Sequence, residues 1–360
     1  MSASVTLARP AGAVFDRDDE LNAAGHEQVV FCHDRATGLQ AIIAIHDTTL
    51  GPALGGTRIY PYPSEAAALT DVLRLSQGMT SKSAAAGMAL GGGKAVIIGD
   101  PHTVKTRELL LAYGRFVDTL GGRYVTAADI GSTADDLDVI AEVTPYVVGK
   151  NKGGTGDSGF STAYGVFCAM RAAAEHRYGP DGLAGRTVGV EGVGKVGARL
   201  VPLLADAGVS KILVSDLDAE ALDRVTSTLP DLLVVPSVLT EDIDVYAPCA
   251  LGATLTPESV RDLRATIVCG GANNQLATAD VAEEIEKQGL LWVPDYVANA
   301  GGVVQVGGEY YGLPAEEVSA KVAHIYDTTR EILTKAEDLG ITTAAAADAV
   351  VAMRINSARR

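Results

Sequence analysis

The chain has 360 residues, which is enough for two domains that each bury a core of their own. Hydrophobic residues make up 47% of the chain and charged residues 21%, a balance typical of a soluble globular protein. The formal net charge of −16 argues against a general affinity for nucleic acid or anionic membranes, because both require basic surfaces.

The cysteines are widely scattered and form no C-x-x-C pair, so we expect neither a metal site nor a redox dithiol. Small apolar fillers of this kind are typical of a reducing compartment. The chain does not open with a basic start and a long apolar run, and no stretch approaches the ~18 apolar residues of a membrane helix. We therefore expect a cytoplasmic protein that does not bind membranes.

Strand and helix patterns alternate in the first part of the chain, which predicts an α/β domain. Arg35-Ala36-Thr37-Gly38 suits a hairpin turn, and Ser64 is a good N-cap for a helix that opens at Glu65. The predicted elements are strands over 28–34 and 39–45, a helix from 65, a strand over 95–98, a helix over 109–120 and a strand over 124–127.

Glycines cluster between Gly149 and Gly159, which predicts a loop where the chain crosses into a second domain. Helices and strands then alternate as β-α-β units, and this order predicts a mostly parallel sheet. The predicted segments are helices over 164–177 and 196–207 and strands over 187–191, 211–215, 243–247, 266–269 and 290–293.

From Glu316 onward the pattern is helical, and we expect the last helices to return to the first domain. The expected division is a first α/β domain over 1–150 with 325–360 added, and a second, doubly wound Rossmann-type domain over 151–324. We assign substrate binding, catalysis and oligomerisation to the first domain and nucleotide binding to the second. The active-site cleft is expected between them.

A dinucleotide-binding fingerprint, Gly192-Val193-Gly194-Lys195-Val196-Gly197, follows the strand over 187–191. Gly192 makes the tight turn, Gly194 lets the backbone approach a pyrophosphate, and Gly197 permits close packing of helix on strand. Asp216 ends the next strand, where a carboxylate binds ribose hydroxyls and repels a 2′-phosphate. The pattern predicts NAD as cofactor. The alternative is a glycine-rich turn that binds nothing.

Small and polar residues follow three later strands, at the sheet edge where open α/β proteins bind ligands. Among them, Asn273 and Asn299 are candidates to bind the nicotinamide ribose, its amide or the substrate. The alternative is that both asparagines only form turns through their own backbone bonds.

Two lysines and an aspartate precede the fingerprint. Lys94 follows three glycines, which let the backbone pass close to a ligand and leave the lysine beside it. One of Lys82 and Lys94 would neutralise a substrate carboxylate, and the other, perturbed by burial and by its neighbour, would act as a base. For Lys82 alone, an ordinary surface lysine is the commoner interpretation. Asp129 is either a proton shuttle or the N-cap of segment 132–143.

Five segments, in order along nearly the whole chain, resemble the Glu/Leu/Phe/Val dehydrogenase family, and in particular its branched-chain members such as the actinobacterial valine dehydrogenases. The segments are Leu50-Gly51-Pro52-Ala53-Leu54-Gly55-Gly56-Thr57-Arg58, Gly78-Met79-Thr80-Ser81-Lys82, Gly91-Gly92-Gly93-Lys94, Gly270-Gly271-Ala272-Asn273-Asn274-Gln275-Leu276 and Tyr296-Val297-Ala298-Asn299-Ala300-Gly301-Gly302.

The resemblance implies roles for the three charged residues. Lys82 would bind the substrate α-carboxylate, Lys94 would be the base that activates water, and Asp129 would move protons at the amino group. Hydride would pass from the amino acid to NAD⁺, water would add to the resulting imine, and the product would leave as a 2-oxo acid and ammonia. The two domains would close to exclude water from the hydride step.

The same resemblance implies further contacts. Gly55 and Gly56 would line the substrate site, Asn273 and Asn299 would contact cofactor or substrate, and Thr162 would meet the nicotinamide amide.

An apolar substrate side chain is implied by the pocket positions. Leu54 stands where glutamate-using relatives carry a lysine, and burying a substrate carboxylate there unpaired would be costly. The other pocket positions, Ala127, Val303 and Val306, are apolar as well. Ala128 departs from some relatives, which carry a polar or acidic residue there, and this leaves the local contacts of Asp129 open.

The expected activity is therefore NAD-dependent, reversible oxidative deamination of branched-chain L-amino acids, with valine preferred and leucine and isoleucine also used. Its partners would be the amino acid, the 2-oxo acid and ammonia, and the enzyme would be a homo-oligomer, either a dimer or an octamer. One alternative is a phenylalanine or other aromatic amino-acid dehydrogenase of the same family. A second is a catalytically silent NAD-binding sensor, which would be free to lose Lys94 or Asp129.

Overall fold

The computed structural model describes residues 25–359, which form two compact units. The first unit comprises the residues up to Thr80 together with Leu90–Val147, and the second comprises Ser81–Ala89 and Val148 onward. The first unit is built from β1 (Gln28–Asp34), β2 (Leu39–Asp47), β3 (Ala53–Tyr60), most of α1 (Glu65–Ala85), β4 (Gly91–Ile98), α2 (Pro101–Val104), α3 (Arg107–Asp118), β5 (Tyr124–Ala128) and α4 (Ala134–Ile140).

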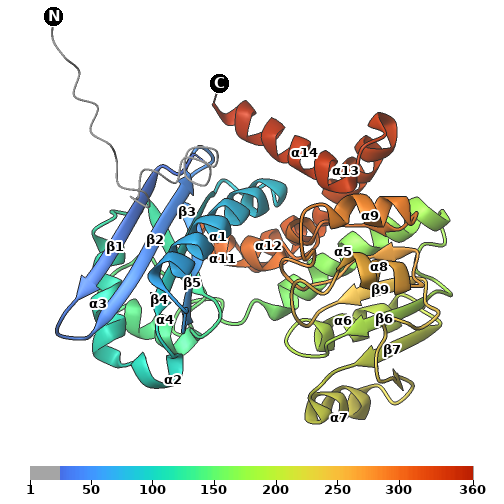
Figure 1. The fold of residues 1–360 in the computed structure, drawn as a ribbon, viewed down its shortest axis with the longest axis horizontal. Coiled ribbons are helices and arrows are strands. Elements are labelled where there is room, and N and C mark those ends of the chain that lie inside the picture. The colour runs from blue at the N-terminus through green and yellow to red at the C-terminus, as the bar shows by residue number, and fades with distance from the viewer. Residues whose placement is uncertain (1–24, 360) are drawn as a thin grey trace, which may run out of the picture. The chain divides into compact units, whose positions relative to one another are not determined.

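The first unit is a sheet of five strands in the order β1-β2-β4-β3-β5, covered by helices (Figure 1). β2 is antiparallel to both of its neighbours, β1 and β4, whereas β3 is parallel to both β4 and β5. Apolar residues alternate along β2, so that Ile42 packs toward Leu69 and Val72 of α1 while Ile43 packs toward α3 and α4. The sheet is therefore buried on both faces.

β3 is a strand of the first unit that the sequence did not predict. It lies between β4 and β5, and its middle residues are Gly55 and Gly56, which have little strand propensity of their own. Their pairing with both neighbours decides the conformation. A Cβ on Gly55 would lie 1.7 Å from the Gly93 carbonyl oxygen, so only glycine allows β3 and β4 to approach this closely.

The glycines before Lys94 also differ from expectation, because β4 begins at Gly91 and includes all three. A Cβ on Gly91 would lie 2.1 Å from the Asp47 carbonyl oxygen, and one on Gly93 would lie 2.7 Å from the Tyr124 ring. These glycines therefore allow close packing inside the first unit. That they also let the backbone pass close to a ligand stays a prediction.

The second unit contains a six-stranded, entirely parallel sheet in the order β11-β10-β9-β6-β7-β8. This is the order of a doubly wound dinucleotide-binding fold, and the strand order reverses between β6 and β9. Its elements are α5 (Gly159–Tyr178), β6 (Thr187–Glu191), α6 (Gly197–Asp206), β7 (Lys211–Ser215), α7 (Ala219–Thr228), β8 (Leu233–Val234), β9 (Val245–Pro248), α8 (Pro257–Asp262), β10 (Ile267–Val268), α9 (Val281–Lys287), β11 (Leu291–Trp292), α10 (Asp295–Ala298), α11 (Gly301–Tyr311), α12 (Ala315–Ala323), α13 (Ile325–Leu339) and α14 (Thr343–Ala358).

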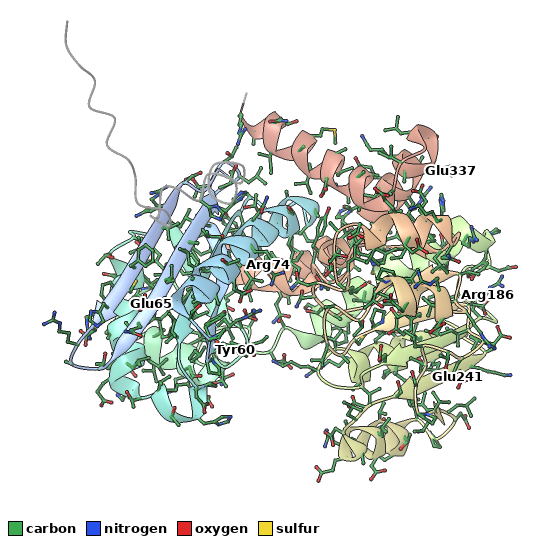
Figure 2. The ribbon with its side chains drawn as sticks, in the orientation of Figure 1. Tyr60, Glu65, Arg74, Arg186, Glu241 and Glu337 are labelled. Carbon is green, nitrogen blue, oxygen red and sulfur yellow. The ribbon has the colours of Figure 1, made fainter. Side chains whose placement is uncertain are left out.

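The C-terminal helices also differ from expectation. We expected residues 325–360 to join the first domain, but α13 packs along α5 and against α14 within the second unit. Ile325 lies against Gly165 of α5, where a Cβ would come within 2.8 Å of the isoleucine side chain. Glu337, labelled in Figure 2, lies 3.7 Å from His176 of the same helix. The apolar face of α13 is thus buried against its own unit.

Candidate functional site

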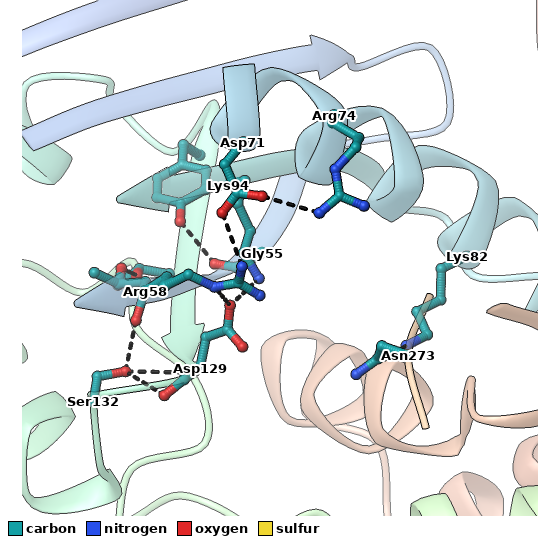
Figure 3. Close-up of polar contacts among 12 residues, drawn as sticks. Gly55, Arg58, Asp71, Arg74, Lys82, Lys94, Asp129, Ser132 and Asn273 are labelled. Atoms are coloured by element: carbon teal, nitrogen blue, oxygen red, sulfur yellow. Dashed lines mark hydrogen bonds and ion pairs between the residues drawn. The ribbon is translucent and has the colours of Figure 1, made fainter. Parts of the chain in front are cut away.

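Lys94 and Asp129 form an ion pair in the first unit (Figure 3). Lys94 lies on β4, and Asp129 follows the last residue of β5, with β3 between the two strands. The Lys94 side chain is only 8% exposed. Burial alone would raise the pKa of the Asp129 carboxyl, but the charges of Lys94 and Arg58 outweigh it and hold this pKa below its usual range.

The approach of Asp129 to this pair depends on Gly56. A Cβ there would lie 2.5 Å from the Ala128 carbonyl oxygen and 2.8 Å from Cβ of Asp129. Gly55 and Gly56 therefore lie beside the ion pair, as members of the strand that separates its two partners. That they line a substrate site stays a prediction.

Arg58 is a functional candidate that sequence reasoning missed. Its Nε lies 3.4 Å from Asp129 Oδ2, and one terminal nitrogen lies 2.8 Å from Asp71 Oδ2. Asp71 in turn accepts hydrogen bonds from Tyr62 Oη at 2.6 Å and from Arg74 at 3.0 Å. Alternation along β3 puts Arg58 on the same face as Gly56, and that spacing was the signal available in the sequence.

The backbone around Asp129 is fixed by Ser132. The amide of Asp129 donates to Ser132 Oγ at 2.9 Å, and this hydroxyl donates to the Thr57 carbonyl oxygen at 2.7 Å. The N-cap of α4 is Thr133, in a capping box with Asp136. The alternative role of Asp129 as a helix cap is therefore wrong, and its carboxylate is engaged by cations.

A second cluster lies in the second unit, around Asn273. Its Oδ1 accepts a hydrogen bond from Lys82 Nζ at 3.0 Å, and both residues are labelled in Figure 3. The same oxygen accepts a hydrogen bond from Asn299 Nδ2 at 2.9 Å. Asn273 thus bonds both Lys82 and Asn299 through its side chain. The alternative, that the two asparagines only form turns through their own backbone bonds, does not account for these contacts. Asn299 Oδ1 is buried and has no hydrogen-bond partner among the described residues. Such an acceptor calls for a ligand atom or water.

Asp295 is a buried acid near this cluster that sequence reasoning did not select. Its carboxylate accepts backbone hydrogen bonds from Gln275 at 3.3 Å and Tyr296 at 2.8 Å. Burial raises the pKa of the Asp295 carboxyl, although the charge of Lys82 and these amides oppose the rise. Asp295 therefore ties the segment that carries Asn273 to the start of α10.

The fingerprint loop has the geometry that a dinucleotide requires. Gly192 has φ of 89°, and a Cβ on Gly197 would lie 1.9 Å from the Gly192 carbonyl oxygen, so both positions need glycine. A Cβ on Gly194 would meet nothing within 4 Å, which leaves this turn open to a ligand. Asp216 Oδ2 accepts from the Val193 amide at 2.7 Å, so the carboxylate that ends β7 lies against the loop.

Lys195 and Val196 complete the loop at the start of α6. Lys195 is exposed, and its Nζ lies 3.1 Å from Asp157 Oδ1, while Arg199 lies 2.7 Å from the other oxygen of that carboxylate. Val196 is the N-cap residue of α6 and packs near Gly271, where a Cβ would lie 2.6 Å from it. Asp157 is a further residue that motif reasoning did not select.

The remaining candidates lie in both units. Thr162 Oγ1 donates to the Ser158 carbonyl oxygen at 3.0 Å and lies against Gly302, where a Cβ would come within 2.8 Å of it. Two further sets are buried apolar positions, one in each unit. They are Leu54 on β3 with Ala127 on β5, and Val303 with Val306 one helical turn apart on α11.

No group of His, Cys, Asp or Glu within residues 25–359 is arranged to hold a metal ion. In the same part of the chain, no helix is both long and apolar enough to cross a membrane.

Two family models match this chain. One describes the Glu/Leu/Phe/Val dehydrogenase dimerisation domain and matches residues 26–146. The other describes glutamate/leucine/phenylalanine/valine dehydrogenase and matches residues 221–360.

Individual relatives match over nearly their whole length. Valine dehydrogenase from Streptomyces virginiae is 51% identical over 93% of this chain and 95% of the relative. Leucine dehydrogenase from Bacillus subtilis is 45% identical over 93% of each chain. The crystal structure of L-tryptophan dehydrogenase from Nostoc punctiforme is 44% identical, with a TM-score of 0.83 over 96% of this chain and 99% of that chain. The chain belongs to the Glu/Leu/Phe/Val dehydrogenase family of amino-acid dehydrogenases, which are oxidoreductases.

Proposed function

We propose that this enzyme catalyses the NAD-dependent, reversible oxidative deamination of branched-chain L-amino acids, with L-valine preferred, to a 2-oxo acid and ammonia. The observation that carries the proposal is the buried ion pair of Lys94 and Asp129, which supplies an acid and a base at one point. The 51% identity to a valine dehydrogenase supports the choice of substrate.

Each charged residue has one task in the proposed reaction. Lys82 binds the α-carboxylate as a charge-assisted hydrogen-bond donor. Lys94 takes a proton from the water that adds to the imine carbon, and Asp129 carries a proton at the amino nitrogen. Arg58 keeps Asp129 ionised, so that this carboxylate is ready to accept a proton at neutral pH. NAD⁺, when bound, accepts the hydride that leaves Cα of the amino acid.

The fingerprint loop fits NAD. The open turn at Gly194 and the N-terminus of α6 suit a pyrophosphate, and Asp216 suits the ribose hydroxyls while repelling a 2′-phosphate. Asn299 Oδ1, a buried acceptor without a partner among the described residues, suits a donor on the cofactor or substrate. Lys195, Val193 and the neighbouring Thr162 belong to the same proposed site.

The substrate pocket is proposed to be apolar, because Leu54, Ala127, Val303 and Val306 offer no partner for a charged side chain. The runner-up is an aromatic amino acid, and the 44% identity to a tryptophan dehydrogenase favours it. Branched-chain and aromatic substrates differ by a few methylene equivalents of pocket volume, each worth about 1–3 kcal/mol in discrimination.

The test is NADH formation by purified protein with NAD⁺ and a panel of L-valine, L-leucine, L-isoleucine, L-phenylalanine, L-tryptophan and L-glutamate. We expect the highest kcat/KM with valine and none above background with glutamate. The Lys94→Met variant should bind NADH like the parent enzyme but turn over at least a hundredfold more slowly, since general base catalysis contributes about 10²–10⁴.

Each other outcome identifies a different error. An aromatic amino acid at the head of the panel would keep the mechanism and overturn the substrate. An active Lys94→Met variant would remove Lys94 from the chemistry. Binding of NADH without turnover of any substrate would favour the silent NAD-binding protein.

A further inference from the structure

Lys82 occupies an unusual place in the fold. It lies in the last turn of α1, and this turn together with the residues up to Ala89 belongs to the second unit, whereas the rest of the helix belongs to the first. The position of the Lys82 ammonium group therefore depends on what holds the end of α1 to the second unit.

Arg354 of α14 binds the end of α1. One terminal nitrogen of this guanidinium donates to the Ala84 carbonyl oxygen at 3.0 Å and to the Ala85 carbonyl oxygen at 2.7 Å. Carbonyl groups in the last turn of a helix lack intrahelical partners, and they carry the negative end of the helix dipole. A planar, permanently charged fork is well suited to bind two of them at once.

The guanidinium is itself oriented by α13. Its second terminal nitrogen donates to Thr328 Oγ1 at 3.3 Å and to Glu331 Oε2 at 3.1 Å. The side chain is 26% exposed, so these contacts are only partly screened by water. Arg354 thus connects three helices through four hydrogen bonds.

Helix α14 also contacts α10, the helix that precedes Asn299. Asp348 of α14 accepts a hydrogen bond from Tyr296 Oη at 2.8 Å, and Tyr296 lies on α10, which ends next to Asn299. Asn299 bonds Asn273, whose Oδ1 accepts from Lys82. Helix α14 therefore contacts both the end of α1, which carries Lys82, and α10, which precedes the asparagine bonded to the partner of Lys82.

We propose that Arg354 is a positioning residue for substrate binding, which acts by holding the last turn of α1 so that Lys82 is placed to bind the substrate α-carboxylate. The proposal rests on the proposed role of Lys82. It assigns to the C-terminal helix a part in carboxylate recognition, although α14 supplies no group that touches the substrate.

The test is the kinetics of Arg354→Met, which keeps a long apolar stem but loses the charge and all four hydrogen bonds. We expect KM for both the amino acid and the 2-oxo acid to rise by about tenfold to a hundredfold, the loss typical of a misplaced binding group. The fall in kcat should be smaller, and Kd for NADH should stay within a factor of about two, because the fingerprint loop is untouched.

Two rescues separate positioning from general stability. Arg354→Lys should recover part of the KM, since an ammonium group can still bind one carbonyl oxygen. Guanidinium chloride added at millimolar concentration should lower the raised KM of Arg354→Ala, whereas the same concentration of sodium chloride should not. Arg264→Met, which removes an exposed arginine of the same unit after α8, is the matched control and should leave KM unchanged.

The inference and the proposed function fail in different ways. If the parent enzyme turns over no amino acid, the proposed function fails first. If the parent is active and Arg354→Met keeps the parent KM, Arg354 does not position Lys82. The same conclusion follows if KM rises, kcat, NADH affinity and melting temperature all fall together, and neither rescue restores KM.

Discussion

The carboxylate of Asp129 is subject to opposing influences, and the outcome decides its state. Burial favours the protonated form, whereas Lys94 and Arg58 favour the ionised form and prevail. From the sequence, Asp129 was equally suited to capping a helix. Asp129 does not cap α4, because Thr133 does, and its carboxylate instead pairs with Lys94, thirty-five positions closer to the N-terminus.

Replacement of Asp129 by asparagine should abolish most turnover and lower stability. The buried Lys94 and the partly buried Arg58 lose their shared counter-charge, and breaking such a pair costs about 3 kcal/mol. We expect kcat to fall by about 10²–10⁴. The measurements are initial rates of NADH formation and urea unfolding, with the exposed Asp181→Asn as control. A variant with the parent rate would remove Asp129 from the proton transfers.

The same residue predicts a pH dependence. Because the pKa of Asp129 in the folded state lies below the ordinary value of 3.8, its carboxylate contributes stability above that pH, and this contribution is lost as the pH falls through and below 3.8. Asp129→Asn should therefore show a shallower loss of stability than the parent over this range. Parallel curves of unfolding free energy against pH would contradict the assignment.

At the scale of the elements, the turn between β6 and α6 contains three glycines in different surroundings. Gly192 and Gly197 are glycines because the backbone itself occupies the space of a side chain, whereas Gly194 has open space around it. The fingerprint pattern correctly predicted the tight turn at Gly192 and the close packing at Gly197, and the role of Gly194 stays a prediction. The close packing of the β4 glycines was not predicted, because their neighbours Asp47, Thr80 and Tyr124 are distant in the sequence.

This difference predicts opposite behaviour for two alanine variants. Gly194→Ala should unfold like the parent in the absence of cofactor, within about 0.5 kcal/mol, because the methyl group meets no protein atom. It should nevertheless weaken NADH binding by about tenfold or more, since backbone must approach the pyrophosphate there.

Gly197→Ala should lose stability without any ligand present, because its methyl group would lie 1.9 Å from the Gly192 carbonyl oxygen. Thermal unfolding of the free protein and fluorescence titration with NADH compare the two variants directly. Unchanged NADH affinity in Gly194→Ala would argue that the cofactor lies elsewhere.

At the scale of the whole molecule, we predict a homo-oligomer, either a dimer or an octamer, because residues 26–146 match a dimerisation domain. A net charge of −16 on every chain means that assembly must overcome repulsion between copies. Salt screens that repulsion, so added salt should not dissociate the oligomer. Sedimentation velocity at low and high salt measures the size of the oligomer and its resistance to salt. A single species with the mass of one chain at both salts would contradict the prediction.

Some of the fold could be predicted because its signals are local. The hairpin at Arg35–Gly38, the helix opening at Ser64, and the fingerprint with Asp216 each depend on residues within about twenty-five positions of one another. β3 and α11 were missed because Gly55-Gly56 and Gly301-Gly302 carry little propensity of their own.

The sequence by itself determined the chemistry that this protein carries: the identities of Lys82, Lys94 and Asp129, the fingerprint, and the family to which they belong. Only the tertiary structure decided which of these residues meet. It joined Asp129 to both Lys94 and Arg58, buried α13 against α5, and brought Arg354 to the end of α1. The physical reason is that such contacts join residues far apart in the chain, and their free energy comes from burial and charge pairing that no local pattern contains.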